Sequence, residues 1–247
     1  MNVEIVFLKE LEARGSSDAT ATALRSNGAL ATATANAKTI AMALPRRLAE
    51  MDAGYLGLCS EFVSRTGMPL VTAPFRHDGG VAMAWISPEG EVIQKACFPD
   101  AGFAQGSDVA VFDTRYGRLA MCCDADIFQP QYARLAALRR CGLLFASSPR
   151  ICIGSSLPPP DALRNGGDEA VFLAGPWASA QANGIAIAFA GTGGGRLILP
   201  CAATADNSGL GHSSVDWDAL SGVNAEFPIF DCMNPELYRK YERELGA

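Results

Sequence analysis

The segment between residues 117 and 148 constrains the fold more than any other part of this 247-residue chain. It opens with Gly117, followed by an apolar run at 118–123 that reads as a strand closed by polar residues. A helix is expected at 131–140, and a second apolar strand at 143–147. A strand, a helix and a strand in close succession indicate a sheet with helices on its outer side.

Short elements of the same kind continue on both sides of this segment. Each strand-like run is apolar and is closed by proline, glycine or polar residues. Helical runs lie between several of them, and Pro176 is expected to interrupt the one at 168–183. The expected strands are 3–8, 39–44, 69–73, 81–87, 109–112, 118–123, 143–147, 185–190 and 196–199; the expected helices are 18–37, 48–66, 131–140, 168–183 and 235–245. This mixture predicts two sheets packed face to face, with helices outside.

Composition argues against several classes of function. A chain of 247 residues with 49% hydrophobic content is large enough for one domain, 1–247, with a sizeable core. The net charge is −6 and no basic patch stands out, which argues against nucleic-acid binding. No uninterrupted apolar stretch is long enough to span a membrane. The first residues read as a strand rather than a signal peptide, so we expect a cytoplasmic protein.

Eight cysteines are many for a chain of this length, but most lie inside apolar runs. No Cys-x-x-Cys pair exists, and the only histidines are His77 and His212. Buried thiols in a reducing compartment are therefore favoured over disulfides or a zinc site, and we expect no metal and no cofactor. The cysteines are Cys59, Cys97, Cys122, Cys123, Cys141, Cys152, Cys201 and Cys232.

The segment that begins at Gly117 resembles the nucleophile segment of the nitrilase superfamily, the carbon–nitrogen hydrolases. In that family a glycine-led strand delivers the pattern Cys-x-Asp-x-x-Phe-Pro-Glu-x-x-Arg. Without gaps, Asp126, Pro130 and Arg134 match its Asp, Pro and Arg. The position of the cysteine then falls on Asp124, seven residues after the glycine, which is the spacing usual in the family.

The resemblance extends over most of the chain in short matches that keep their order. It covers 3–37, the strand 40–44 that runs into Pro45, the hairpin 81–98, the stretch 103–114 and the late segment 179–190. Within the nucleophile segment, Gln129 and Gln131 depart from the pattern by replacing its Phe and Glu. The resemblance implies an α/β protein, a four-layer αββα sandwich of the nitrilase type, commonly paired into dimers. We therefore expect a homodimer, joined near the helix at 131–140 and the helix at 235–245.

Nitrilase relatives use a Glu–Lys–Cys triad, and all three positions are changed here. Cysteine attacks the substrate carbon, glutamate moves protons, and lysine stabilises the developing negative charge. The glutamate position is Arg46, the lysine position is Phe98 and the cysteine position is Asp124. A guanidinium stays protonated and cannot act as a base, and a phenyl ring carries no charge for an oxyanion.

Two other readings of the cysteines and of the lysine remain open. Shifting the nucleophile to Cys122 or Cys123 requires gaps on both sides of a strand, and a one-residue slip reverses the faces of every side chain. In the ungapped register Cys123 is expected to face away from the site, and Cys122 is the residual thiol candidate. Lys95 is either a displaced catalytic lysine or a solvated lysine after a strand, and Glu50 and Glu61 are either replacement bases or surface charges.

Two hypotheses about function follow. In the first, the chain is a non-catalytic pseudoenzyme that binds a small molecule or a partner, such as an active paralogue. In the second, it is a carbon–nitrogen (amide or nitrile) hydrolase with altered chemistry that uses Asp124 or Cys122 as nucleophile. Under both hypotheses two arrangements of Arg46 and Asp124 remain open. The two side chains pair across the pocket that holds the triad in the family, with Phe98 filling the volume of the lysine, or they reach solvent separately.

Overall fold

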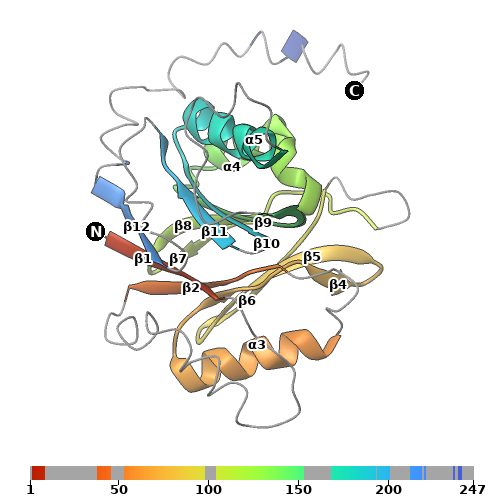
Figure 1. The fold of residues 1–247 in the computed structure, drawn as a ribbon, viewed down its shortest axis with the longest axis vertical. Helices are drawn as coiled ribbons and strands as arrows, with labels where there is room; N and C mark the ends of the chain where they lie inside the picture. The colour runs from red at the N-terminus through yellow and green to blue at the C-terminus, as the bar shows by residue number, and fades with distance from the viewer. Residues whose placement is uncertain are drawn as a thin grey trace.

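The computed structural model describes residues 2–8, 38–45, 53–97, 104–152, 168–192, 194–200 and 212–218, together with residues 220, 236, 239 and 240. Within them, two β-sheets pack face to face, with helix α3 outside one sheet and helices α4 and α5 outside the other (Figure 1). This is the four-layer αββα sandwich that the sequence predicts. The elements are β1 (Asn2–Leu8), β2 (Thr39–Ala43), α3 (Ala53–Thr66), β3 (Leu70–Val71), β4 (Phe75–His77), β5 (Gly80–Ser87), β6 (Gly90–Lys95), β7 (Val111–Thr114), β8 (Gly117–Cys123), the 3-10 helix η2 (Asp124–Phe128), α4 (Pro130–Leu138), β9 (Leu143–Cys152), α5 (Asp168–Asn183), β10 (Ala186–Thr192), β11 (Gly194–Ile198) and β12 (His212–Asp216).

The order of strands brings the ends of several parallel strands to the same edge. The first sheet has the order β12-β1-β2-β3-β5-β4, with β6 also paired to β5, and β1, β2 and β3 run parallel. The second sheet has the order β11-β10-β9-β8-β7, and β8, β9 and β10 run parallel. Loops that follow parallel strands leave at their carboxyl ends, which is where sites are usually built in such sheets.

Three buried apolar clusters fill the spaces between the four layers. One lies between the two sheets and includes Phe7, Trp85 and Phe145; another lies between the second sheet and helices α4 and α5; the third lies between the first sheet and α3. At Gly195 the ring of Phe7 packs so closely that an added Cβ would lie 2.1 Å from its Cδ1 atom. Glycine is therefore required there for the two sheets to approach each other.

The structure differs from the sequence-based expectations in several elements. The prediction that Pro176 interrupts the helix is wrong, since α5 continues through it. The preceding residue is Gly175, which has no Cβ to clash with the proline ring. Strands β4 and β12 were not expected from sequence. The expected helix at 18–37 lies outside the described residues, and of the one at 235–245 only residues 236, 239 and 240 are described, as helical.

Among the residues that the structure describes, no helix is both long enough and apolar enough to cross a membrane.

Candidate functional site

The backbone places Asp124 at the point where a strand ends and a turn begins. Strand β8 ends at Cys123, whose backbone is still extended, and Asp124 is the first residue of η2. An apolar strand that delivers a polar residue at its carboxyl end is the arrangement that the ungapped alignment requires. Of Asp124 the structure describes only the backbone, so the direction of its side chain stays a prediction.

The strands that precede Arg46 and Phe98, the other two predicted triad positions, end in the same buried cluster as β8. Leu44 follows β2, Ala96 follows β6 and Cys123 ends β8, and all three belong to the apolar cluster between the sheets. Arg46 and Phe98 themselves lie outside the described residues. Convergence of their side chains with Asp124 therefore remains a prediction.

Two of these three strand ends are joined by a direct hydrogen bond. The backbone N–H of Cys97 donates to the Asp126 carboxylate, at 2.9 Å from Oδ1 and 3.1 Å from Oδ2. Asp126 is fully buried. Cys97 immediately precedes position 98 and Asp126 lies two residues after position 124, so the segments carrying these positions touch.

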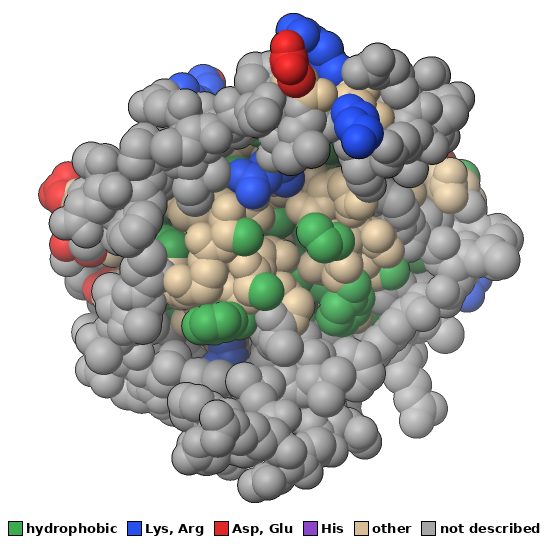
Figure 2. All heavy atoms as spheres, turned by 90° about the horizontal axis from the view of Figure 1, so that it is seen from above, with side chains coloured by type: hydrophobic (Ala, Val, Ile, Leu, Met, Phe, Trp, Pro, Cys, Tyr) green, Lys and Arg blue, Asp and Glu red, His purple; other side chains and the backbone are tan. Residues whose placement is uncertain are grey.

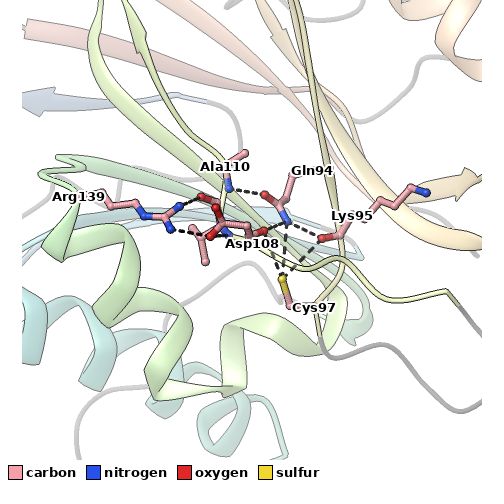
Figure 3. Close-up of polar contacts among 7 residues, drawn as sticks. Gln94, Lys95, Cys97, Asp108, Ala110 and Arg139 are labelled. Atoms are coloured by element: carbon pink, nitrogen blue, oxygen red, sulfur yellow. Dashed lines mark hydrogen bonds and ion pairs between the residues drawn. The ribbon is translucent and has the colours of Figure 1, made fainter. Parts of the chain in front are cut away.

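A second set of hydrogen bonds fixes the chain between β6 and β7 (Figure 3). The Gln94 side chain, almost fully buried, donates from Nε2 to the carbonyl oxygen of Asp108 at 2.9 Å and to that of Lys95 at 2.5 Å. Its Oε1 accepts the N–H of Ala110 at 2.5 Å. Arg139, just after α4, bonds the Asp108 carboxylate at 2.6 Å. We call the bonds made by Gln94, Arg139 and Asp126 the loop clamp.

The thiol of Cys97 lies within the loop clamp and is poorly suited to act as a nucleophile. Its Sγ is 3.5 Å from the carbonyl oxygen of Asp108 and 3.8 Å from Nε2 of Gln94. Burial, together with the negative charges of Asp126 and Asp108, raises the pKa of Cys97 to about 11. Because the thiolate is the reactive form, this thiol is almost wholly protonated near neutral pH.

Cys122 and Cys123 point to opposite faces of β8. Cys123 lies between the sheets, with its Sγ 3.8 Å from the carbonyl oxygen of Val81. Cys122 is fully buried in the cluster beneath α4, beside Tyr132. The Tyr132 hydroxyl donates to the carbonyl oxygen of Met121 at 2.5 Å, and burial raises the pKa of Tyr132. Both thiols therefore have the surroundings of structural cysteines.

Lys95, the other lysine candidate, points away from the space between the sheets. Val92, Gln94 and Ala96 face the second sheet, so alternation along β6 turns Lys95 to the opposite face. Its ammonium lies 3.6 Å from the Asp78 carboxylate, in the turn between β4 and β5. Figure 3 shows the side chain extending away from Cys97 and Asp108. This arrangement favours the surface interpretation of Lys95.

The remaining acidic candidates also have surface positions or are not described. Glu61 forms an ion pair with Arg65 one turn later on α3, with both side chains 43% exposed. Glu50 lies outside the described residues. Within the described parts of the chain, no three His, Cys, Asp or Glu side chains are grouped as metal ligands.

Gln94, Cys97 and Asp108 were not singled out as functional residues from the sequence. Alternation along the strand at 92–96 does place Gln94 on the same face as two apolar residues, which is a signal that a buried amide would need partners. The partners, Asp108 and Ala110, are more than a dozen residues away along the chain, so no local pattern identifies them.

Comparison with known proteins finds similar structures but no matching family model or curated protein. No family model and no curated protein matches the sequence. Solved structures do match it: the carbon–nitrogen hydrolase from Helicobacter pylori G27 aligns with a TM-score of 0.68 at 12% identity, over 97% of this chain and 98% of that one. The chain has the nitrilase fold. Nit3 of Saccharomyces cerevisiae, a member of the nitrilase superfamily, aligns with a TM-score of 0.64 at 11% identity, over 95% and 96% of the two chains. The NitN amidase from Nesterenkonia sp. AN1 aligns with a TM-score of 0.62 at 17% identity, over 97% and 99%. At such identities a shared nitrilase fold does not carry activity with it.

Proposed function

We propose that residues 1–247 form one nitrilase-fold domain that acts as a pseudoenzyme, binding a small molecule or a protein partner at the converging strand ends without hydrolysing it. The observation that carries the proposal is the placement of Asp124. It opens η2 at the end of β8. In the ungapped alignment this is the position of the cysteine in the family pattern. A carboxylate is a much weaker nucleophile than a thiolate, and Arg46 and Phe98 remove the base and the charge stabiliser as well.

The proposal is tested by offering the protein a panel of aliphatic and aromatic amides and nitriles. We expect no ammonia release above that of the heat-denatured protein, and no mass increase of the intact chain. Ammonia release that is abolished in Asp124→Ala and retained in Cys122→Ala would overturn it. Binding is measured on the same panel by the shift in melting temperature, which rises with ligand concentration for any ligand bound by the folded state alone.

The alternative is a carbon–nitrogen hydrolase of altered chemistry. The observation that favours it is that an aspartate, Asp124, follows directly after β8, since carboxylates do serve as nucleophiles in other hydrolases. Of the two nucleophile candidates Asp124 is the stronger, because Cys122 is fully buried beneath α4. Accumulation of a covalent adduct on the peptide that contains Asp124 would support this alternative.

We also propose a cytoplasmic homodimer, with the binding of an active paralogue as a second possibility for the same surface. Large apolar side chains are exposed on η2, α4 and α5: Phe128 is 36% exposed, Leu135 43% and Trp177 54%. Figure 2, seen from above onto the side that carries α4 and α5, shows exposed hydrophobic side chains across the centre of this face. Exposed apolar groups gathered on one face often mark an interface.

Sedimentation velocity tests the homodimer. We expect a dimer whose dissociation is promoted by Trp177→Asp and unaffected by Ser64→Asp, which places the same charge on an exposed residue of α3. A monomer at all protein concentrations contradicts the homodimer, and the paralogue then becomes the remaining partner proposal.

A further inference from the structure

One serine hydroxyl is enclosed between the two sheets without a protein partner. Ser147 is fully buried in β9, and no described residue forms a hydrogen bond with its Oγ. Buried polar groups in folded proteins are almost always paired, so such a hydroxyl marks a place where another molecule completes the bond. We infer that Ser147 Oγ holds a small uncharged hydrogen-bonding molecule between the sheets.

The strand pattern fixes the direction of the Ser147 side chain. Leu143 and Phe145 lie in the apolar cluster between the sheets, whereas Leu144 and Ala146 lie in the cluster beneath α4 and α5. Side chains alternate along a strand, so Ser147 points between the sheets.

The neighbours of Ser147 in the adjacent strands are small. Ser147 pairs with Cys123 of β8 on one side and with Ala190 of β10 on the other, and Ala190 pairs with Gly195 of β11. Cys123 and Ala190 also face between the sheets. The ring of Phe7, from the first sheet, covers the Gly195 end of this row. The side chains beside the Ser147 hydroxyl are therefore short, and only a molecule of a few heavy atoms suits this place.

The row lies at the edge where the parallel strands end. Cys123 is the last residue of β8 and stands opposite Ser147, while β9 continues to Cys152. Small molecules usually bind at the carboxyl ends of parallel strands. The inference rests on the proposed function only in placing a small molecule at this edge, and it uses none of the triad-equivalent positions.

Other buried hydroxyls in the chain have protein partners. Thr72 is fully buried, and its Oγ1 accepts the N–H of Ala84 at 2.8 Å. Thr39 is buried, and its Oγ1 donates to Oε2 of Glu4 at 3.2 Å. A hydroxyl has one donor and two acceptor positions, and leaving all of them unused in an apolar interior is unfavourable. Ser147 therefore differs from these residues in needing a partner from outside the chain.

The surroundings of Ser147 decide the chemical class of that partner. Beside it lie the thiol of Cys123 and the methyl group of Ala190, within an apolar cluster. A charged molecule in such an interior is costly without a counter-charge. The bound molecule is therefore uncharged and offers one oxygen to the hydroxyl. It comes from one of two sources, namely solvent water or a small neutral organic solute such as an alcohol or a ketone.

Oxygen-17 magnetic relaxation dispersion tests the first source by counting long-lived internal waters, and hydroxyl protons do not contribute to it. Ser147→Ala removes a single oxygen atom, so the variant should fold. We expect one long-lived water fewer in Ser147→Ala than in the native protein. The control Thr72→Val removes a buried hydroxyl that already has a protein partner, and its water count should equal the native one.

Backbone amide chemical shifts test the second source, with ethanol and acetone as the added solutes. A solute held by Ser147 changes the amide resonances of Cys123, Ser147 and Ala190 in a saturable way. Loss of the hydrogen bond in Ser147→Ala should weaken this binding about fivefold. The amide of Thr72, in the loop between β3 and β4 of the first sheet, should not respond.

Each outcome decides the inference. A water count that falls by one assigns the bound molecule to solvent, and saturable shifts that weaken in Ser147→Ala assign it to a solute. An unchanged water count, together with no shifts that depend on Ser147, overturns the inference. Ser147→Ala should then melt above the native protein, because it removes an unpaired buried group. An equal loss of water in Thr72→Val also overturns the inference, since it indicates general loosening of the interior. Ammonia release by the native chain overturns the pseudoenzyme proposal alone.

Discussion

The space between the two sheets and the edge where β6 and β8 end are held together in different ways. Between the sheets, large apolar side chains such as Phe7 and Trp85 fill the volume, and small residues such as Gly195 allow their close approach. At the edge, buried polar groups such as Gln94 and Asp126 each meet a particular partner. Packing constrains total volume, which many sequences satisfy, whereas a hydrogen bond constrains the identity of both partners.

This difference accounts for a conserved fold at very low sequence identity. A structure only 12% identical still aligns with a TM-score of 0.68 over nearly the whole chain. Apolar residues of similar size replace one another between the layers at small cost, so the scaffold persists. The changes that we predict to matter for chemistry are Arg46, Phe98 and Asp124, which the ungapped alignment assigns to the positions of a catalytic triad in the family that the chain resembles.

The largest effect is expected from overfilling the interior. In Gly195→Ala the new Cβ would lie 2.1 Å from Cδ1 of Phe7, so the variant should lose about 3 kcal/mol of unfolding free energy in urea titrations. Phe7→Leu in the same chain should recover part of that loss, because a smaller side chain leaves room for the methyl group.

A helical glycine provides the matched control. A Cβ at Gly57, in α3, meets nothing within 4 Å, so Gly57→Ala should stabilise the fold by about 0.5–1 kcal/mol. If both glycine variants change stability equally, close approach between the sheets is not what requires Gly195.

The second prediction concerns the loop clamp. Gln94→Leu keeps the volume but leaves the Ala110 N–H and the Asp108 carbonyl without this partner, and it should cost about 2 kcal/mol. Arg139→Ala removes an ion pair whose partners are 42% and 62% exposed, and it should cost less than about 1 kcal/mol. Urea unfolding of both variants checks the order, and a larger loss in Arg139→Ala would mean that the surface pair, not the buried amide, holds the loop.

The sequence predicts the interior better than it predicts the edge. The strands at 118–123 and 143–147 are recovered in β8 and β9 because an apolar run closed by polar residues is a local signal. Strand β12 is missed because its sequence, His-Ser-Ser-Val-Asp, is mostly polar and it forms by pairing with β1, some two hundred residues earlier. The loop clamp is missed for the same reason, since its partners are chosen by the fold and not by spacing along the chain.

The third prediction concerns thiol reactivity across the same two regions. Among the cysteines whose side chains the structure describes, none forms a disulfide: Cys59, Cys97, Cys122, Cys123 and Cys141. Burial raises the pKa of Cys59 and of Cys141 to about 12, so both should resist alkylation at pH 8 until the chain unfolds. Cys97, which is only partly buried and has a pKa of about 11, should react slowly in the folded protein.

Neutralising the Asp126 carboxylate should change the alkylation rate of Cys97 and of no other of these three cysteines. After burial, the charge of Asp126 is the next cause of its raised pKa, so Asp126→Asn should accelerate alkylation of Cys97 and leave Cys59 and Cys141 unchanged. Peptide mass spectrometry of the folded protein after timed alkylation gives the three rates. Acceleration at all three cysteines would indicate general loosening of the interior and not an electrostatic effect at the edge.

The smallest effect is expected from the exposed ion pair between Asp113 and Arg118, with Nε to Oδ1 at 2.8 Å and side chains 74% and 44% exposed. Hydrogen bonds from Arg118 lower the pKa of Asp113 below its ordinary value. A carboxyl whose pKa is lower in the folded than in the unfolded chain adds stability above its unfolded pKa, near 4, and loses it as the pH falls through the folded value. Asp113→Asn should therefore melt slightly below the native protein at pH 7, and the two melting temperatures should converge as the pH falls below about 4.

The difference in melting temperature at pH 7 should also shrink in 1 M salt, because solvent-exposed charges are screened. A difference in melting temperature that persists at pH 2.5, or that grows on acidification, would mean that Asp113 stabilises the protein through something other than its charge. The protein would then contain stabilising polar contacts that are neither buried packing nor charge pairing.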